Sequence, residues 1–553
     1  MSETFHADPA NPAPPNGGSP SSDPRPSTSA APTDTTIAEY LQYLAPELWK
    51  ARRLPSWPPD TFALIASLLR ESGAYAAGLG CLPKERASWV KTVETVGEDW
   101  AKCGAAVPSQ LIEWWDAVLA ASDRPLSAIR DEPPLCRAVL GLLAASDCAC
   151  AGAGVPATHR RMDAFESEAY SALLDSEHDF GSATLCRGIH PSRARVLPKM
   201  HTPQTGLTLR SMTHHVALCP TGDVIPKWSF WPAFKGSASH KLNILLVPWP
   251  NRVTPTSFGV ASRPDAGRAC FCFDPPSSGG EPAKHLQRLI DNARSLVGEI
   301  DGVIFPELSL DEMEYRQVAK VAAQEGALLV CGVRRQASGE GPGRNYVSVS
   351  SPVAGGMGVA YEQDKHHPWR LDRSQLRQYS LGGRLDPNVQ WWEDIRIHRR
   401  EVTINVCYPW LAFCVLICED LARQEPISNL VRAIGPNLVI ALLMDGPQLG
   451  NRWPSRYASV LADDPGSSVL TVTSIGMSEL SRAGSGVSRS RVIAMWRDAR
   501  SGPAEEIELP PDKDAAVISL TEERATEWTA DGRDDGGVAG FPVLSGVVFV
   551  DTD

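Results

Sequence analysis

The sequence has no long apolar run free of charge, no paired spacing among its cysteines and no excess of positive charge. Its most apolar long segment, Leu135 to Ala157, contains Arg137 and Asp147, which would be costly in a bilayer. We therefore expect no membrane span and interpret this segment as a buried helix. The 13 cysteines show no disulfide-like spacing, and the amino terminus lacks a basic stretch followed by an apolar run. These absences favour a cytoplasmic protein with reduced thiols.

The formal net charge of -12 argues against a broad phosphate-binding surface, so nucleic acid is not the expected partner. The composition, 43% hydrophobic and 21% charged, is typical of a soluble globular protein. A chain of 553 residues is too long for one hydrophobic core. Two to four domains are therefore expected.

The composition divides the chain into four parts. Residues 1–35 are rich in Pro, Ser and Ala with few large apolar side chains, which predicts a disordered tail. Residues 36–154 repeat apolar positions at helical spacing and predict a helical domain. Residues 155–239 contain short mixed stretches with turn residues, which we interpret as a connecting subdomain.

Residues 240–553 alternate apolar, β-rich runs with helix-like segments, which indicates an α/β sandwich. No short internal period is present, so a solenoid is not expected. The predicted fold class is thus α/β at the carboxyl terminus, preceded by a mostly α-helical domain and a disordered tail.

Three polar residues follow predicted apolar strands of the α/β part. Glu307 follows Val303 to Pro306, Lys365 follows Val359 to Tyr361, and Cys418 follows Val415 to Ile417. Strand ends are where α/β folds place active sites. Between Glu307 and Cys418 the only other lysine is Lys320, which lies in a predicted helix. Lys365 is therefore the only candidate for a lysine at a strand end in this interval.

The segments around these residues are similar to motifs of the nitrilase, or carbon-nitrogen hydrolase, superfamily. The matched segments are Phe305-Pro306-Glu307, Asp364-Lys365-His366-His367-Pro368-Trp369 and Ile417-Cys418-Glu419-Asp420-Leu421. The resemblance covers roughly residues 241–550. It implies an αββα sandwich and a Glu-Lys-Cys triad at Glu307, Lys365 and Cys418, and it implies a homo-oligomer.

The residue types suit this chemistry independently of the resemblance. An amide, carbamoyl or nitrile carbon needs a strong nucleophile, and a thiol serves if its proton can be removed near neutral pH. Glu307 is the candidate base, and it could return that proton to the departing amine. Lys365 and the backbone N–H of Glu419 would stabilise the oxyanion of a tetrahedral intermediate. The expected reaction is hydrolysis through a Cys418 thioester, without a cofactor.

The sequence departs from the family pattern after the lysine. Many family members carry a second glutamate there that positions the catalytic groups, but residues 370–380 contain none. Gln375 or the more distant Glu393 could substitute. The stretch from Gly382 to Glu401, rich in Trp and Arg, is a candidate lid over the pocket.

Other readings of individual residues remain open. Glu307 alone would suit a helix-capping carboxylate, and Cys418 alone a small buried residue. A metal site is the alternative for a set of histidines and cysteines whose spacing matches no familiar ligand pattern, namely His201, His214, His215, Cys186 and Cys219. Asp463 and Asp464 resemble an acidic metal-binding pair but precede Pro465-Gly466, so we interpret them as a turn.

Two functions are compatible with the sequence. The first is a thiol hydrolase acting on a small amide, carbamoyl or glutamine-like amide substrate. The alternative is a catalytically degenerate nitrilase-like sensor or regulatory protein, in which a metabolite binds without turnover, including a role in a bacterial defence system. In either case the helical domain is a candidate surface for a protein partner.

Overall fold

The fold is described from a computed structural model. It describes residues 35–103, 106–154, 164–178, 183–222, 224–231, 240–261, 267–275, 281–337, 341–353, 356–407, 410–481 and 490–552. The predicted disordered tail, residues 1–35, falls outside these ranges except for Thr35. None of the helices in the described ranges is long and apolar enough to span a bilayer.

The amino-terminal part consists of helices packed around α8. Their bounds are α1 (Ile37–Leu44), α2 (Pro46–Lys50), α3 (Pro58–Ser72), α4 (Ala74–Gly78), α5 (Arg86–Cys103), α6 (Ser109–Ala120), α7 (Ala128–Asp131) and α8 (Pro133–Cys148). Thr36 begins α1 with a capping box, in which its side chain accepts from Glu39 N–H and Glu39 accepts in return. Almost every residue of α8 is buried, as expected for the central helix of a bundle.

The middle segment joins the two main parts of the molecule. Helix α9 (Ala164–His178) is followed by the antiparallel strands β1 (Arg195–Pro198) and β2 (Val216–Cys219). Strand β3 (Val224–Trp231) then pairs in parallel with β13 of a large sheet. The carboxyl-terminal sandwich therefore begins before residue 240, earlier than the composition suggested.

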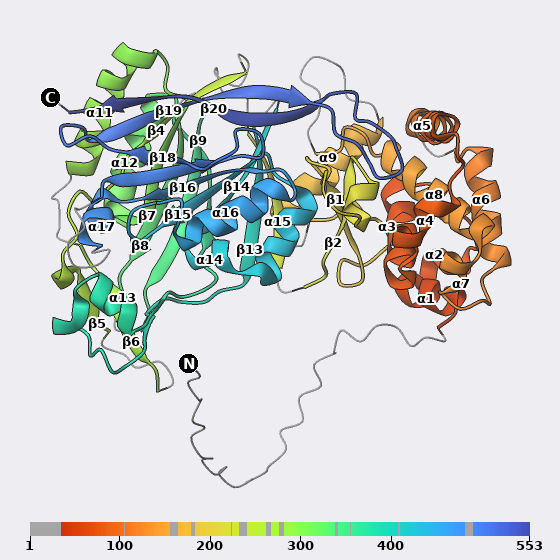
Figure 1. The fold of residues 1–553 in the computed structure, drawn as a ribbon, viewed down its shortest axis with the longest axis horizontal. Helices are drawn as coiled ribbons and strands as arrows, with labels where there is room; N and C mark the ends of the chain where they lie inside the picture. The colour runs from red at the N-terminus through yellow and green to blue at the C-terminus, as the bar shows by residue number, and fades with distance from the viewer. Residues whose placement is uncertain are drawn as a thin grey trace, which may run out of the picture.

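Two seven-stranded sheets form the carboxyl-terminal part (Figure 1). The first sheet has, in spatial order, β10 (Gly356–Asp364), β9 (Arg344–Val353), β8 (Leu328–Arg335), β7 (Gly302–Asp311), β4 (Lys241–Leu246), β19 (Ala515–Ala525) and β20 (Ala539–Val550). The second has β18 (Glu505–Glu508), β17 (Val492–Arg497), β16 (Ser468–Thr473), β15 (Leu438–Leu443), β14 (Leu411–Ile417), β13 (Arg400–Cys407) and β3.

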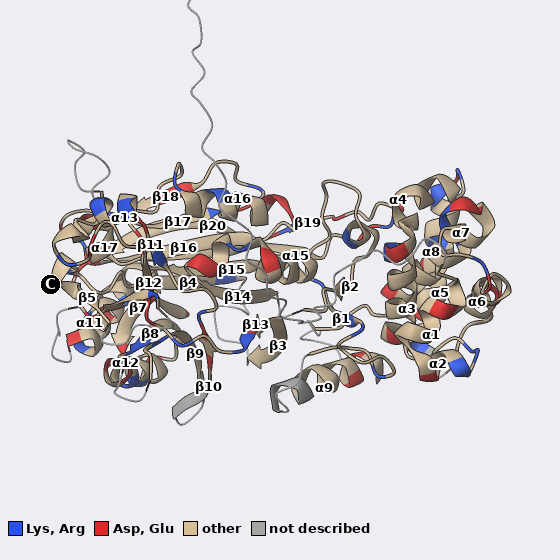
Figure 2. Ribbon diagram, turned by 90° about the horizontal axis from the view of Figure 1, so that it is seen from below, with Lys and Arg blue, Asp and Glu red and all other residues tan. Residues whose placement is uncertain are grey.

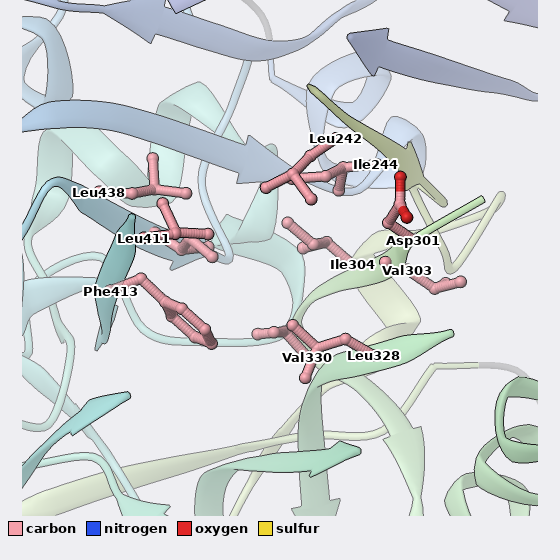
Figure 3. A pocket seen from close by; sticks show the side chains of 12 residues that line it. Leu242, Ile244, Asp301, Val303, Ile304, Leu328, Val330, Leu411, Phe413 and Leu438 are labelled. Carbon is pink, nitrogen blue, oxygen red and sulfur yellow. The ribbon is translucent and has the colours of Figure 1, made fainter. Parts of the chain in front are cut away.

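The sheets pack face to face through apolar side chains. Figure 3 shows Leu242 and Ile304 of the first sheet opposite Leu411, Phe413 and Leu438 of the second, around a small internal cavity. Helices α11 (Glu281–Val297) and α12 (Glu312–Gln324) pack against the first sheet. Helices α14 (Glu419–Ala422), α15 (Asn429–Ile434) and α16 (Trp453–Asp463) follow strands of the second sheet. The predicted mixed α/β class is confirmed.

A smaller structure, which we call the cap, packs on one end of the sandwich. Its four-stranded sheet has the order β11 (Arg370–Leu371), β12 (Trp391–Glu393), β6 (Ala269–Phe273) and β5 (Phe258–Val260), and α13 (Arg373–Gln378) completes it. Of the four strands of this sheet, the predicted lid, residues 382–401, supplies only β12, because β11 precedes it and β5 and β6 come from a segment more than 100 residues earlier. The last two residues of the predicted lid begin β13. Buried Met444 and Met477 of the sandwich share an apolar cluster with the cap.

The cap and the helical domain lie at opposite ends of the molecule. Figure 1 shows β5, β6 and α13 at one end and α1 to α8 at the other, and Figure 2 shows the same separation after a quarter turn. The helical domain therefore does not cover the end of the sandwich on which the cap packs.

Candidate active site

The three residues singled out in the sequence lie beneath the cap and are buried. Lys365 directly follows β10, and Cys418 directly follows β14. Glu307 lies inside β7, at an irregularity where pairing with β8 is interrupted between Phe305 and Leu310. Their exposed fractions are 2% for Glu307, 1% for Lys365 and 2% for Cys418.

The backbone at Glu307 is shaped by its neighbour strand. Gly332 of β8 lies so close that a Cβ there would be 2.1 Å from Pro306 O and 2.6 Å from Glu307 Cα. Leu308 has a φ of +54°, a conformation that is strained for a residue with a branched side chain. The bulge thus removes the backbone at Glu307 from the regular pairing with β8. It is possible because Gly332 has no side chain.

Cys418 sits in a strained turn between β14 and α14. Its φ and ψ are 48° and -106°, outside the regions that non-glycine residues usually adopt. The Cys418 N–H donates to Leu442 O of β15 at 2.9 Å, which fixes the turn to the sheet. Backbone strain of this kind concentrates at functional sites, where the surrounding structure holds it in place.

Lys365 bridges two carboxylates. Its Nζ donates to Glu307 Oε1 at 2.7 Å and to Glu393 Oε2 at 2.6 Å. Burial alone would lower the pKa of Lys365, but the two negative charges outweigh it and raise the pKa well above its usual value. Lys365 is therefore a fixed positive charge at neutral pH.

Glu307 accepts three hydrogen bonds. Besides the bond from Lys365, Asn345 Nδ2 donates to Oε1 at 2.8 Å and Met444 N–H donates to Oε2 at 2.5 Å. Burial raises the pKa of Glu307, Lys365 opposes that effect, and the charge of Glu393 adds to it. A carboxyl group with a raised pKa can both take and return a proton, which suits a general acid–base.

Glu393 contacts Lys365, although the two residues are far apart in the sequence. Besides Lys365, it accepts from Asn345 Nδ2 at 2.7 Å and from Trp369 N–H at 2.9 Å. Gln375 was the other candidate and does not lie in this cluster. Its side chain instead completes the capping box that begins α13, where Asp372 N–H donates to Gln375 Oε1 at 3.0 Å.

Cys418 carries a protonated thiol in this arrangement. Burial raises the pKa of the thiol well above its usual value, the charge of Glu307 adds to that effect, and Lys365 opposes it. The thiol form of Cys418 is therefore favoured over the thiolate at neutral pH.

Asp420, two residues after Cys418, anchors the loop that carries Lys365. Its carboxylate accepts from the backbone N–H groups of His366 and His367 at 3.0 to 3.2 Å and lies 2.9 Å from His367 Nδ1. These contacts tie the lysine loop to the cysteine turn.

The side chain of Glu419 points to Arg423, with which it forms an ion pair. Only its backbone N–H, at the start of α14, remains available as the oxyanion donor that the sequence suggested. Asn345 was missed in the sequence because an asparagine at the start of a strand carries no distinctive signal. It contacts both Glu307 and Glu393 and so orients the two carboxylates.

The alternative metal ligands of the sequence serve other purposes. His201 Nδ1 lies 3.0 Å from Glu527 Oε1, and the backbone N–H groups of His214 and His215 donate to Asp147. Asp464 ends α16 and forms ion pairs with Arg210 and Arg432. Within the described residues, no group of three or more His, Cys, Asp or Glu side chains could hold a metal ion.

No model of a protein family matches the sequence, and no curated protein matches it. Solved structures of the nitrilase superfamily match about half of the chain. A CN-hydrolase superfamily protein from Xanthomonas campestris is 16% identical, with 51% of this chain and 90% of that chain covered and a TM-score of 0.31. Nit3 from Saccharomyces cerevisiae is 11% identical, with 48% and 86% covered and a TM-score of 0.31.

An amidase from Nesterenkonia sp. is 12% identical, with 52% of this chain and 92% of that chain covered and a TM-score of 0.31. The superfamily named from the motifs is thus found again among the solved structures. Because these identities and TM-scores are low, the chemistry of the site rests on the contacts of Glu307, Lys365 and Cys418.

Proposed function

We propose that the protein is a thiol hydrolase of nonpeptide carbon-nitrogen bonds, with Cys418 as nucleophile, Glu307 as general acid–base and Lys365 as a fixed positive charge. The observation that carries the proposal is the buried Glu307–Lys365–Glu393 bridge beneath the cap, with its bonds of 2.7 and 2.6 Å. Burying three charges is costly unless they are tightly paired. Such a cluster beside a strained cysteine suits catalysis better than packing alone.

In the first half-reaction, Cys418 Sγ forms a bond to the substrate carbonyl carbon while Glu307 takes the thiol proton. The carbonyl oxygen becomes negative, and Lys365 Nζ with Glu419 N–H stabilises it. The tetrahedral intermediate collapses when the carbon-nitrogen bond breaks and Glu307 gives its proton to the departing nitrogen. Ammonia or an amine leaves, and the acyl group remains on Cys418 as a thioester.

In the second half-reaction, water attacks the thioester carbon and Glu307 takes a proton from that water. The carbon-sulfur bond breaks, the proton passes to Cys418, and a carboxylic acid is released. Protons and electrons balance over the cycle, which consumes one water for each carbon-nitrogen bond cleaved. Glu307 ends each half-reaction in the ionisation state in which it began.

Glu393 has a positioning role in this scheme. It gives Lys365 a second carboxylate partner, so the lysine stays bound when Glu307 becomes protonated. Asn345 keeps both carboxylates in place. The arrangement is preorganised, so little rearrangement has to accompany charge development in the transition state.

The test is intact mass spectrometry of the full chain incubated with a pooled set of amides, carbamoyl compounds and nitriles, with ammonia release measured in parallel. Wild type is expected to show an acyl adduct or ammonia, and Cys418→Ala neither. Cys414→Ala is the matched control, since Cys414 is buried in β14, the strand that Cys418 follows, and makes none of the contacts of the site. If wild type forms no adduct and releases no ammonia while ligands bind, the sensor alternative replaces the hydrolase.

A further inference from the structure

Three buried oxygen atoms have no hydrogen-bond partner in the described part of the chain, and they belong to residues that contact Glu307 or lie within four residues of Met444, which does. They are Asp445 Oδ2, Gln448 Oε1 and Asn345 Oδ1. All three are acceptors that cannot donate. A buried acceptor without a partner is unfavourable and needs an explanation, and a ligand that supplies N–H or O–H donors is one.

The contacts of Asp445 fix the direction of its unpartnered oxygen, Oδ2. Its Oδ1 accepts from Tyr379 O–H of the cap and from Arg452 Nη2, the latter at 2.8 Å. Its backbone carbonyl accepts from Thr473 Oγ1 at 2.6 Å. With the backbone and Oδ1 both fixed, Oδ2 keeps one direction, and the side chain is only 6% exposed.

Asp445 also lies next to the reacting groups. It follows Met444, whose N–H donates to Glu307 Oε2, and it is tied to the cap through Tyr379. The charge of Asp445 contributes to the raised pKa of the Cys418 thiol, which agrees with this proximity. Asp445 is thus one residue from a direct contact of Glu307 and close enough to Cys418 for its charge to act on the thiol.

The orientation of Gln448 is fixed by its own contacts. Its Nε2 donates to Gly446 O at 2.9 Å, which leaves Oε1 as the unpartnered end of the amide. The amide cannot be reversed without placing an oxygen against the Gly446 carbonyl. Gln448 is 1% exposed, so solvent does not satisfy this oxygen.

The region around Glu307 and Asp445 holds more negatively than positively charged side chains. Among the described residues, the carboxylates of Glu307, Glu393 and Asp445 form ion pairs with two cations, Lys365 and Arg452. One negative charge is in excess. A substrate ending in a carboxylate would be repelled, whereas one ending in a cation would be attracted.

We propose that the acyl part of the substrate ends in a protonated amine or a guanidinium group, whose N–H donors bind Asp445 Oδ2 and Gln448 Oε1. This proposal rests on the proposed hydrolase function, because it places the acyl group of that reaction. The substrate class is then cationic amides or carbamoyl compounds.

The test measures binding separately from turnover. Titration calorimetry on the full-length Cys418→Ala variant uses amides with acyl chains of equal length, over a short series of lengths, that end in an ammonium, a methyl or a carboxylate group. The ammonium amide is expected to bind at least tenfold more tightly than the methyl amide, and the carboxylate amide more weakly still. Equal affinities, tightest binding of the carboxylate amide, or no binding of any amide would overturn the proposal.

Two variants locate the selectivity. Asp445→Asn, in the Cys418→Ala background, keeps an acceptor for Tyr379 and Arg452 but removes the charge, and is expected to lose at least tenfold of the ammonium preference. Gln448→Met removes the second acceptor without altering the Asp445–Arg452 pair, so it tests the proposal if Asp445→Asn does not fold. Asp464→Asn is the control, since Asp464 pairs with Arg210 and Arg432.

The outcomes separate the two proposals. Ammonium-selective binding without turnover by wild type would refute the hydrolase and keep the cation site. Turnover of all three amides at similar rates would keep the hydrolase and refute the cation site. A preference that Asp445→Asn and Gln448→Met both leave unchanged would also refute it.

Discussion

At the scale of the residue, Lys365 determines how the site behaves. It is buried with its charge retained, because two carboxylates compensate for the lost hydration. Removing either carboxylate leaves an uncompensated or misplaced charge beneath the cap. Effects of substitutions here are therefore expected on the chemical step and on stability together.

Glu393→Gln is expected to lower kcat/KM by roughly 100-fold, about 2.7 kcal/mol of transition-state stabilisation. Glu393 now accepts hydrogen bonds from three donors, and the N–H group of the glutamine amide would face at least one of these donors. Because the charge of Glu393 raises the pKa of Glu307, its loss should also move the acid limb of the kcat/KM profile to lower pH. An unchanged acid limb would contradict the coupling, and Glu401→Gln, at an ion pair with Lys227, is the control.

The thiol of Cys418 should react slowly with iodoacetamide at neutral pH. The thiolate is the nucleophile, and burial together with Glu307 holds the pKa of the thiol above its usual value, so alkylation should accelerate as the pH rises through and beyond 9. This reverses the simple expectation that an active-site cysteine is unusually reactive at rest. Alkylation followed by peptide mapping between pH 6 and pH 10 checks it, and a rate that is already maximal at pH 7 would disprove it.

The three candidate residues could be named from the sequence because their signal is local. Each follows an apolar run, and Lys365 is the only lysine between Glu307 and Cys418 outside a predicted helix. The choice between Gln375 and Glu393 could not be made, since it depends on how β12 returns to pair with β6 in the cap. Asp445 likewise could not be singled out from the sequence, because its proposed role depends on contacts with Tyr379 and Arg452, which lie in other segments of the chain.

At the scale of the element, the bulge of β7 is the feature on which the position of Glu307 depends. A strand without the irregularity would keep residue 307 in the ladder and direct its side chain to one face of the sheet. The bulge is possible because β8 has no side chain at Gly332. The local geometry of β7 and β8 thus determines where the Glu307 carboxylate lies relative to Lys365 Nζ.

Gly332→Ala is expected to lower kcat/KM at least tenfold, about 1.4 kcal/mol, because the new Cβ forces the Pro306–Glu307 backbone to move. Gly302→Ala in β7 is the matched control, since a Cβ there would meet its nearest neighbour, Leu328 O, at 3.7 Å, an ordinary contact. Steady-state kinetics of both variants check the prediction. Equal activity of the two variants would show that the backbone can relax without displacing Glu307.

Elements with clear end signals could be predicted closely. The predicted helix that contains Lys320 is α12 (Glu312–Gln324), and Asp311 is its N-cap, a residue type that favours a helix start. The cap resisted prediction because its strands are as short as two residues and pair with segments far away in the sequence. Strands this short contain too few residues to show the alternating hydrophobic pattern from which a strand is predicted.

At the scale of the whole molecule, the helical domain is joined to the sandwich by a buried polar cluster. Arg533, in the connection between β19 and β20, donates to Asp147 of α8 at 3.0 Å and to Met212 O at 2.7 Å. His214 lies in the same cluster, with its Nδ1 2.9 Å from Thr202 Oγ1. The joint therefore depends on a set of groups that titrate.

The free energy of unfolding is expected to fall as the pH drops below about 6.5. Burial and Arg533 lower the pKa of His214 to about 3, so between those values the unfolded chain binds a proton that the folded chain does not. Stability then decreases with falling pH, by up to about 1.4 kcal/mol per pH unit for this group. Chemical denaturation between pH 5 and pH 7 should show a smaller slope for His214→Asn than for wild type, while His190→Asn, at an exposed site, should keep the wild-type slope.

The position of the helical domain bears on its role. It lies at the end of the molecule away from the cap, so substrates are expected to reach Cys418 without passing it. A surface for a protein partner there stays a prediction from the sequence. Its distance from the cap means that a partner would act on the site only through the sandwich.

The pairing of β3 with β13 has a practical consequence for dividing the chain. A fragment beginning at Lys241 would lose β3 and leave the unpaired backbone of β13 at the rim of the second sheet, a template for association between molecules. Such a fragment is expected to aggregate, whereas one beginning before Val224 should remain monodisperse in light scattering. An isolated sandwich therefore has to include the eight-residue strand β3, which lies upstream of its apparent boundary.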